Sequence, residues 1–509
     1  HTPTPPPPPS THSFHRRQRQ MCIRDSINVG GLSTGMVVFI LIMLYVNYEY
    51  SVDQYHQNKD SIYRIVKQEE GNMYLGKNRF AVTMAPLAPT VLEEFPEVKS
   101  AARIVRTWNV IIKQDDETIL EPVIYGIDPE SFDIFSFSFL HGNPDTYLRK
   151  KYSVVISEKI ARKYFEDENP VGQVLLYNEE VELEIGGVIK DMPLNSHFRM
   201  DIMLPFETLL GLTNRKEDLF KWNNSSYYTY ILLQDNSDPA SLEEKFPALM
   251  SKYSADEHII AGHTTRLYLE KFSRIHLHSD IHFDIGPTVN IDRLYIYSTI
   301  AILILLIACI NYMNLASARA ATRAREVGIR KVAGAYRHNL VFQFLGESLF
   351  LSFFSLLASL LLVSIILPYF KQFVELDLTL NFLHEPRLLV VLLSVCLIVG
   401  VVAGSYPAFA LSGYKPILVL KGYFSRSPGG SRLRKALVII QFTISSCLII
   451  SALIITQQLS YIQKKDMGYE RNHILTFRLK DNDILDKIPV LKEELQNLPE
   501  VLNVSVSSN

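Results

Sequence analysis

The chain has 509 residues, of which 48% are hydrophobic and 20% are charged, and its net charge is −2. A net charge so close to zero gives no reason to expect binding to nucleic acid, and we expect none. None of the four cysteines (Cys22, Cys309, Cys396 and Cys447) lies in the long hydrophilic region of the chain. This distribution argues against a disulfide framework in that region.

The first 26 residues, HTPTPPPPPSTHSFHRRQRQMCIRDS, are rich in proline and then basic, and they match nothing downstream. They resemble translated adapter or primer sequence. We therefore interpret residues 1–26 as a leader that is non-native or disordered, and we leave it out of the fold. A genuine disordered cytoplasmic tail is the alternative.

Five long charge-free runs follow, each of about 20 residues or more, which is enough for a helix to cross a hydrocarbon core of about 30 Å. A set of buried core helices is the alternative, but buried helices seldom run so long without an ionisable residue. We predict a membrane protein with an α-helical transmembrane bundle and a large mixed α/β extracytoplasmic domain. The five predicted spans are residues 27–48, 294–318, 346–370, 388–412 and 436–459.

The polar region at residues 49–292 is long enough for a folded domain and reads as mixed α/β. Residues 156–165 have helical spacing of their apolar side chains, and residues 85–98 read as a short helix ended by Pro96. Strands are predicted at 181–192, with a turn at Gly186–Gly187, and at 226–234.

Three histidines lie near the end of this region, at His276, His278 and His282. On a strand they would share one face, which could bind a metal. Alternation of polar and apolar residues is, however, also the ordinary pattern of a strand with one solvated face. We therefore favour an ordinary polar strand face near the membrane and predict no metal site.

The segment Thr322–Leu345 lies between the second and third spans and carries one acidic residue, Glu326, against the basic residues Arg323, Arg325, Arg330, Lys331 and Arg337. The loop after the fourth span is also basic and has no acid, whereas the loop after the third span has more acids than bases. Because cytoplasmic loops are enriched in Lys and Arg, both basic loops should be cytoplasmic. The N-terminus is then cytoplasmic, and both polar regions are extracytoplasmic.

The same segment reads as a polar helix up to Arg330–Lys331, an interruption at Gly334–Ala335, and an apolar-rich helix that leads to Glu347. Two explanations fit this pattern. One is an interfacial helix held by anionic membrane lipid. The other is a coupling helix that fits a cleft on a cytoplasmic partner. The residues alone leave both open.

Motifs for enzymatic chemistry are absent from the sequence. No phosphate-binding Gly-x-x-x-x-Gly-Lys-Ser/Thr loop occurs, and the candidate at Pro428–Ser431 lacks the lysine. The one Gly-x-Ser-x-Gly match, Gly31–Gly35, lies inside the first apolar run and not at the strand-to-helix turn that a nucleophile elbow needs, and His-Glu-x-x-His does not occur. We expect a non-catalytic chain that binds no cofactor.

An internal repeat is visible after the fifth span. Phe95–Val98 follows the first span, and Leu498–Val501 follows the fifth at a similar spacing, after a predicted helix at residues 488–498. We interpret residues 460–509 as the start of a second extracytoplasmic domain. The sequence is then expected to be a C-terminally truncated fragment.

Arg325–Ala335, REVGIRKVAGA, closely resembles the motif after the second span of MacB/FtsX-type ABC transporter permeases. Gly404–Ala408 also resembles this family, within an FtsX-like permease domain at residues 294–414. In the polar region, Asn169–Gly172 and Val188–Pro193 resemble the MacB-like periplasmic core domain. The resemblance extends from Ile27 to Asn509 and is closest to the long, duplicated members.

The resemblance implies a permease subunit in the cell inner membrane that pairs with a separate cytoplasmic ABC ATPase. Its work would be mechanotransmission for export or extracytoplasmic substrate handling. It also implies a second permease copy or half and an extracytoplasmic partner. The residues carried over as ATPase-coupling residues are Arg325, Glu326, Gly328, Arg330, Lys331 and Gly334: the charged ones would face the ATPase, and the glycines would allow close approach.

For the individual arginines, a role as positive-inside anchors is the alternative. A second function is also open, in which an FtsX-like signalling scaffold activates an extracytoplasmic partner without moving a substrate. A membrane-anchored sensor is a third, but five spans and a basic loop argue against it.

Overall fold

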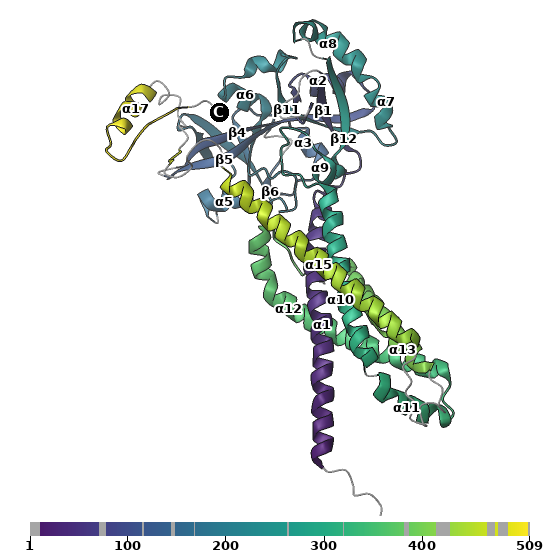
Figure 1. Ribbon diagram of the computed structural model, residues 1–509. Coiled ribbons are helices and arrows are strands. Elements are labelled where there is room, and N and C mark those ends of the chain that lie inside the picture. Colours follow the sequence, from purple (N-terminus) through teal and green to yellow (C-terminus); the bar gives the residue numbers. More distant parts are fainter. Residues whose placement is uncertain are drawn as a thin grey trace, which may run out of the picture.

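The computed structural model of the protein separates a large α/β domain from a bundle of long helices (Figure 1). The two parts are joined by α1 and α10, which both run from the bundle to the domain (Figure 1). The structure describes residues 11–70, 78–114, 117–143, 148–166, 168–261, 264–318, 320–380, 386–413, 428–465, 474–476 and 487–506.

Within these residues, five helices are long and apolar enough to cross a membrane, which confirms the predicted number of spans. The first of them begins inside segment 1–26, and its apolar part starts at Ser26. The bundle helices are α1 (Thr11–Ser51), α10 (Ile291–Ala318), the short α11 (Ala320–Val332), α12 (Arg337–Val374), α13 (Pro386–Ser412) and α15 (Pro428–Lys464).

The bundle core lies between α1, α10, α12 and α13, and small residues bring these helices close together. A Cβ added at Gly35 would lie 2.6 Å from the Cβ of Ala308, and one added at Gly404 would lie 2.6 Å from the Cβ of Ser348. Small residues at contacts are how membrane helices gain van der Waals packing, since lipid is as apolar as their side chains. α15 packs mainly on α10, and its apolar stretch is otherwise exposed.

The α/β domain is built on one sheet, in the order β12-β1-β11-β4-β5-β10-β7-β9-β6, with β2, β3 and β8 paired beside it. Most neighbours are antiparallel, but β10 with β5 and β7 with β9 are parallel. The strands are β1 (Ile62–Glu70), β2 (Arg79–Phe80), β3 (Thr83–Met84), β4 (Val98–Gln114), β5 (Glu117–Ile127), β6 (Phe139–Gly142), β7 (Ser153–Ser157), β8 (Val174–Tyr177), β9 (Val181–Ile189), β10 (Ile202–Pro205), β11 (Ser225–Leu233) and β12 (Thr264–Lys271).

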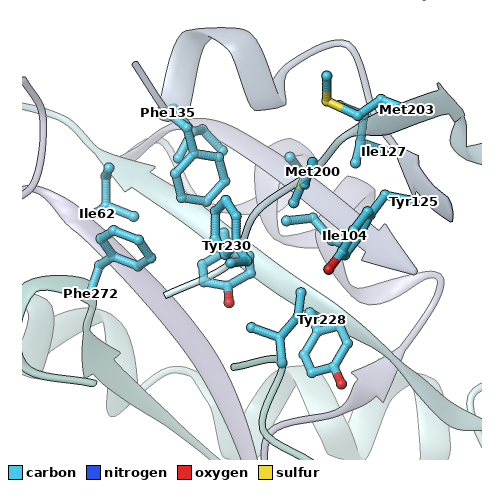
Figure 2. Close-up of a cluster of buried hydrophobic side chains, with 14 of the residues drawn as sticks. Ile62, Ile104, Tyr125, Ile127, Phe135, Met200, Met203, Tyr228, Tyr230 and Phe272 are labelled. Atoms are coloured by element: carbon cyan, nitrogen blue, oxygen red, sulfur yellow. The ribbon is translucent and has the colours of Figure 1, made fainter. Parts of the chain in front are cut away.

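Helices cover both faces of this sheet, as the alternation of strand side chains requires. On β4, Ile104 joins one apolar cluster and the next residue, Val105, joins the cluster on the other face. Figure 2 shows the first cluster, in which Tyr230 packs 5.2 Å from Phe135 and 5.9 Å from Phe272, measured between ring centroids. The helices of this domain are α2 (Leu87–Glu94), α3 (Ser131–Ile134), α5 (Glu158–Phe165), α6 (Phe206–Leu212), the 3-10 helix η1 (Lys216–Phe220), α7 (Pro239–Glu243), α8 (Phe246–Ala261) and α9 (Phe272–His278). A further helix, α17 (Ile488–Gln496), follows α15 in the chain and has no buried residue.

The local predictions for the polar regions are largely confirmed. The helices expected at 85–98, 156–165 and 488–498 are α2, α5 and α17, and the strands expected at 181–192 and 226–234 are β9 and β11. The turn predicted at Gly186–Gly187 is wrong, because β9 continues through both glycines. Its pairing with β7 shifts by one residue there, so the chain accommodates Gly186 as a bulge.

The strand predicted for the three histidines is also wrong. Residues 272–278 form α9, because the buried Phe272 and Ile275 are spaced for one face of a helix. His276 is buried, His278 is exposed, and His282 lies beyond the helix. Among the described residues, no group of three or more His, Cys, Asp or Glu side chains could hold a metal ion.

Candidate functional site

The segment Thr322–Leu345 lies at the end of the bundle farthest from the α/β domain (Figure 1). It consists of most of α11, a short turn and the first residues of α12, as its sequence predicts. We call it the coupling segment. The side chains of its first residues, up to Arg325, lie outside the described part of the structure.

The turn in the coupling segment is fixed by Gly334, which has φ +99°. Its N–H donates to the carbonyl of Lys331 at 3.1 Å, and the N–H of Ala335 donates to the carbonyl of Arg330 at 3.0 Å. These two bonds make a Schellman cap, in which a left-handed residue, usually glycine, ends a helix. Gly334 therefore sets the angle between α11 and α12.

Apolar contacts attach the coupling segment to the bundle. Val327 of α11 packs with Leu340 and Phe344 of α12 and with Ala408 of α13, and all four are buried. This small cluster joins three helices, so α11 is packed against the bundle rather than projecting freely from it.

Two basic side chains add to this attachment at the end of α13. The Lys331 ammonium donates to the carbonyl oxygen of Ser412 at 2.7 Å, and Arg337 Nε donates to the hydroxyl of Ser412 at 3.4 Å. Ser412 is the last residue of α13, where unpaired carbonyls and the helix dipole both favour a cation. Movement of α11 would therefore displace α13 as well as α12.

The outer face of α11 carries one exposed ion pair. Arg330 Nη2 donates to Glu326 Oε1 at 2.7 Å, and Arg330 Nη1 donates to Gln343 Oε1 at 2.6 Å. An exposed i,i+4 pair contributes only about 0.3–0.5 kcal/mol, so these charges can exchange their partners at little cost.

The same segment also exposes apolar side chains: Ile329 is 57% exposed, Val332 is 66% exposed and Tyr336 is 72% exposed. The outer face of the coupling segment thus offers charge and apolar surface together.

The sequence-predicted site residues divide between these two roles. Glu326 and Arg330 lie on the outer face, whereas Lys331 holds the end of α13 and Gly328 is buried. Gly334 caps α11, and the side chain of Arg325 lies outside the described residues. The sequence analysis did not single out the exposed Ile329, Val332 and Tyr336. A helical projection of α11 could have identified Ile329, because it lies on the opposite side of the helix from the buried Val327.

A second group of charged side chains, also missed from sequence, lies where the α/β domain meets α1 and α10. Arg64 of β1 is fully buried. It donates to Asp284 Oδ1 at 2.6 Å, to Asp284 Oδ2 at 3.0 Å and to Glu270 Oε2 at 2.6 Å. His197 Nε2 lies 3.1 Å from the same Asp284 carboxylate. We call these four residues the Arg64 network.

The Arg64 network links β1, the first strand after α1, to the segment that precedes α10. Arg64 follows α1 in the chain, and Asp284 precedes α10. Burial alone would raise the pKa of Asp284, but His197 and the Arg64 guanidinium hold it well below its usual range. The carboxylate is therefore kept charged inside the domain by its partners.

Residues 26–249 match the MacB-like periplasmic core domain, and residues 298–416 match the FtsX-like permease C-terminal domain. One similar protein is the macrolide export ATP-binding/permease protein MacB of Agrobacterium fabrum, 23% identical over 356 residues, which are 69% of this chain and 50% of the relative. MacB of Shewanella sp. (strain W3-18-1) is 26% identical over 231 residues, 44% of this chain and 32% of the relative.

A solved structure of the periplasmic region of MacB from Actinobacillus actinomycetemcomitans is 16% identical, with a TM-score of 0.31, and covers 42% of this chain and 90% of that one. The chain spans half or less of the length of the two curated relatives described here. The two matched domains cover most of the chain and place the core domain before the permease domain. The chain therefore belongs to the MacB/FtsX-type ABC transporter permeases.

Proposed function

We propose that this chain is a membrane-spanning permease subunit that converts ATP hydrolysis by a cytoplasmic ATPase into movement of its α/β domain, for export or extracytoplasmic substrate handling. The observation that carries the proposal is the two-sided coupling segment. Its inner face is fixed to α12 and α13 through Val327 and Lys331, while its outer face leaves Arg330 accessible. A force applied to the outer face would reach the bundle directly.

The orientation follows from the distribution of charge along the bundle. The basic Arg330, Lys331 and Arg337 lie at the α11 end, and the α/β domain lies at the other (Figure 1). Since basic residues are enriched on the cytoplasmic side, the coupling segment and the N-terminus face the cytoplasm, and the α/β domain is extracytoplasmic. The basic residues near the membrane surface also suit anionic lipid headgroups.

We propose that the ATPase partner is a separate chain. The two named relatives are called ATP-binding/permease proteins, whereas the 509 residues here contain no phosphate-binding loop. The partner surface would bring acidic groups to Arg330 and an apolar cleft to Ile329 and Tyr336, because complementary charge gives specificity and apolar contact gives affinity. A second copy or half of the permease would supply a second coupling segment.

The proposal is tested by changing only the outer face. The chain is purified from membranes of its source with its partners, and ATP hydrolysis that accompanies it is measured. Ile329→Asp combined with Arg330→Glu should lower that activity on the order of tenfold, because like charges and desolvated carboxylates oppose docking. Lys331 is left unchanged because it holds α13.

Lys371→Glu is the matched control, since Lys371 lies near the far end of α12 in an exposed pair with Asp377. It should leave the accompanying ATP hydrolysis unchanged. If the double variant is inserted at normal levels and retains the wild-type activity, the coupling segment is not the ATPase docking surface.

A further inference from the structure

His276 occupies a three-way contact between the α/β domain and the two helices that connect it to the bundle. Its ring Nε2 lies 2.5 Å from Glu49 Oε2 on α1, and its Nδ1 lies 3.1 Å from the carbonyl oxygen of Pro287. The backbone carbonyl of His276 accepts from the N–H of Val289 at 2.8 Å. We call Glu49, His276 and Pro287 the His276 junction.

The His276 junction is buried and lies beside an apolar contact among the same elements. The side chain of His276 is 11% exposed and that of Glu49 is 5% exposed. Next to them, Val46 of α1, Leu277 of α9 and Leu294 of α10 form a buried cluster. The apolar cluster contains no ionisable group, so of these two contacts only the polar one can respond to protons.

The two neighbours of the His276 ring determine how many protons the junction must hold. A carbonyl oxygen only accepts hydrogen bonds, so Nδ1 must carry a proton to bond Pro287. If Nε2 is also protonated, it donates to the Glu49 carboxylate. If Nε2 is bare, the contact needs a protonated Glu49 to donate to it.

In both cases the formed contact holds one proton more than a neutral imidazole beside a carboxylate. Loss of that proton leaves two lone pairs facing each other across a short, buried distance, and an unsatisfied buried pair is costly. The contact between α1 and α9 therefore requires that proton.

Other ionisable groups face the His276 junction from the elements around it. The Tyr45 hydroxyl hydrogen-bonds Glu49 from the same helix, and Arg293 of α10 lies near Tyr45. Tyr48 of α1 also interacts with Glu49. Asp53, beyond the end of α1, interacts with His276. Of these groups, only the His276–Glu49 pair shares a proton across the boundary between α1 and α9.

We propose that the Glu49–His276 pair is a proton-dependent contact that positions α1 against α9 and the start of α10. What this contact does for movement rests on the proposed function. With the proton bound, the Glu49–His276 contact is formed, and movement of α1 and α10 is passed through it to the α/β domain. The contact itself does not depend on that function, because it can be measured without any ATPase.

The test is amide hydrogen exchange of the full chain in lipid nanodiscs at about pH 5 and about pH 8, the interval over which histidine side chains change charge. Exchange of the Val289 amide is followed after correction for the intrinsic effect of pH. In the wild type it should become on the order of tenfold faster at the higher pH, as expected for loss of a charge-assisted hydrogen bond.

Glu49→Gln is the decisive variant, because its amide can donate to a neutral His276 or accept from a charged one. It should keep Val289 protected at both pH values. His276→Ala should lose the protection at both, and His278→Gln should behave as the wild type, since His278 is exposed and bonds only within α9.

A flat wild-type profile would overturn the proposal. So would a Glu49→Gln variant that keeps the full pH dependence, because the response would then come from another group such as Asp53. Wild-type ATP hydrolysis in the coupling-segment double variant, with these exchange results intact, would instead count against the proposed function alone.

Discussion

The two ends of the helical bundle carry ion pairs of opposite kinds. At the coupling segment, Arg330 and Glu326 are exposed, and their pair contributes only about 0.3–0.5 kcal/mol. At the α/β domain, Arg64 is fully buried between Asp284 and Glu270. Breaking a buried pair by removing one partner costs about 3–5 kcal/mol, because a charge is left buried without compensation.

The exposed pair is therefore suited to binding another surface, and the buried network is suited to maintaining the fold. The Arg330 pair can open to meet another surface, while the coupling segment stays attached through Val327 and Phe344. The Arg64 network cannot open without destabilising the domain, so it keeps the connections of α1 and α10 together. The proposed transfer of force from one end of the chain to the other would need this combination.

The largest effect is expected from Arg64→Met, which removes the buried cation and leaves Asp284 and Glu270 facing each other. The free energy of unfolding of the α/β domain should fall by about 3–5 kcal/mol. Both tryptophans, Trp108 and Trp222, lie in this domain, so tryptophan fluorescence during denaturant unfolding of the detergent-solubilised chain reports on it.

Arg330→Met is the matched substitution at the other end and should change stability by less than about 1 kcal/mol. Equal losses from Arg64→Met and Arg330→Met would remove the distinction between the two ends.

A smaller effect should appear on acidification. The folded pKa of Asp284 is depressed, so its ion pairs contribute stability above the unfolded pKa, about 3.9, and that stability is lost as pH falls. Unfolding measured from about pH 6 down to about pH 3 should show this loss. Asp284→Asn should lower the free energy of unfolding and remove the part of its pH dependence that comes from this carboxyl. If stability depends on pH as steeply in Asp284→Asn as in the wild type, the acid-induced loss comes from other carboxyl groups.

The sequence predicts the structure correctly where a single local pattern determines it. Five apolar runs predict five long helices, and Gly334 interrupts a polar helix where the structure has the Schellman cap. The resemblance of REVGIRKVAGA to the permease motif and the family matches likewise agree on one architecture. These signals lie within a short window and need no knowledge of distant contacts.

The Arg64 network and the His276 junction could not be predicted, because their members are far apart in the chain. Arg64 and Asp284 are separated by 220 residues, and Glu49 and His276 by 227. Only the fold brings them together. The strand prediction for the three histidines was wrong for a different reason. Their spacing fits one face of a strand, but the buried Phe272 and Ile275 are spaced for one face of a helix.

The smallest effect considered concerns the backbone of the coupling segment. Gly334 has φ +99°, and an L-residue in the left-handed region costs about 1–2 kcal/mol. Gly334→Ala should therefore loosen the Schellman cap and speed amide exchange at Ala335, whose N–H donates to the carbonyl of Arg330. Gly334→Asn should have a smaller effect, because asparagine tolerates this conformation better.

Gly346→Ala provides the contrast on α12, where a Cβ would meet no atom within 4 Å and the backbone is helical. There alanine should stabilise the helix by about 0.5–1 kcal/mol. If Gly334→Ala behaves like Gly346→Ala, the angle between α11 and α12 is not set by the cap. The position of α11 relative to α12 would then depend on side-chain contacts alone. The weak Arg330–Glu326 pair would contribute more to that position than its exposure suggests.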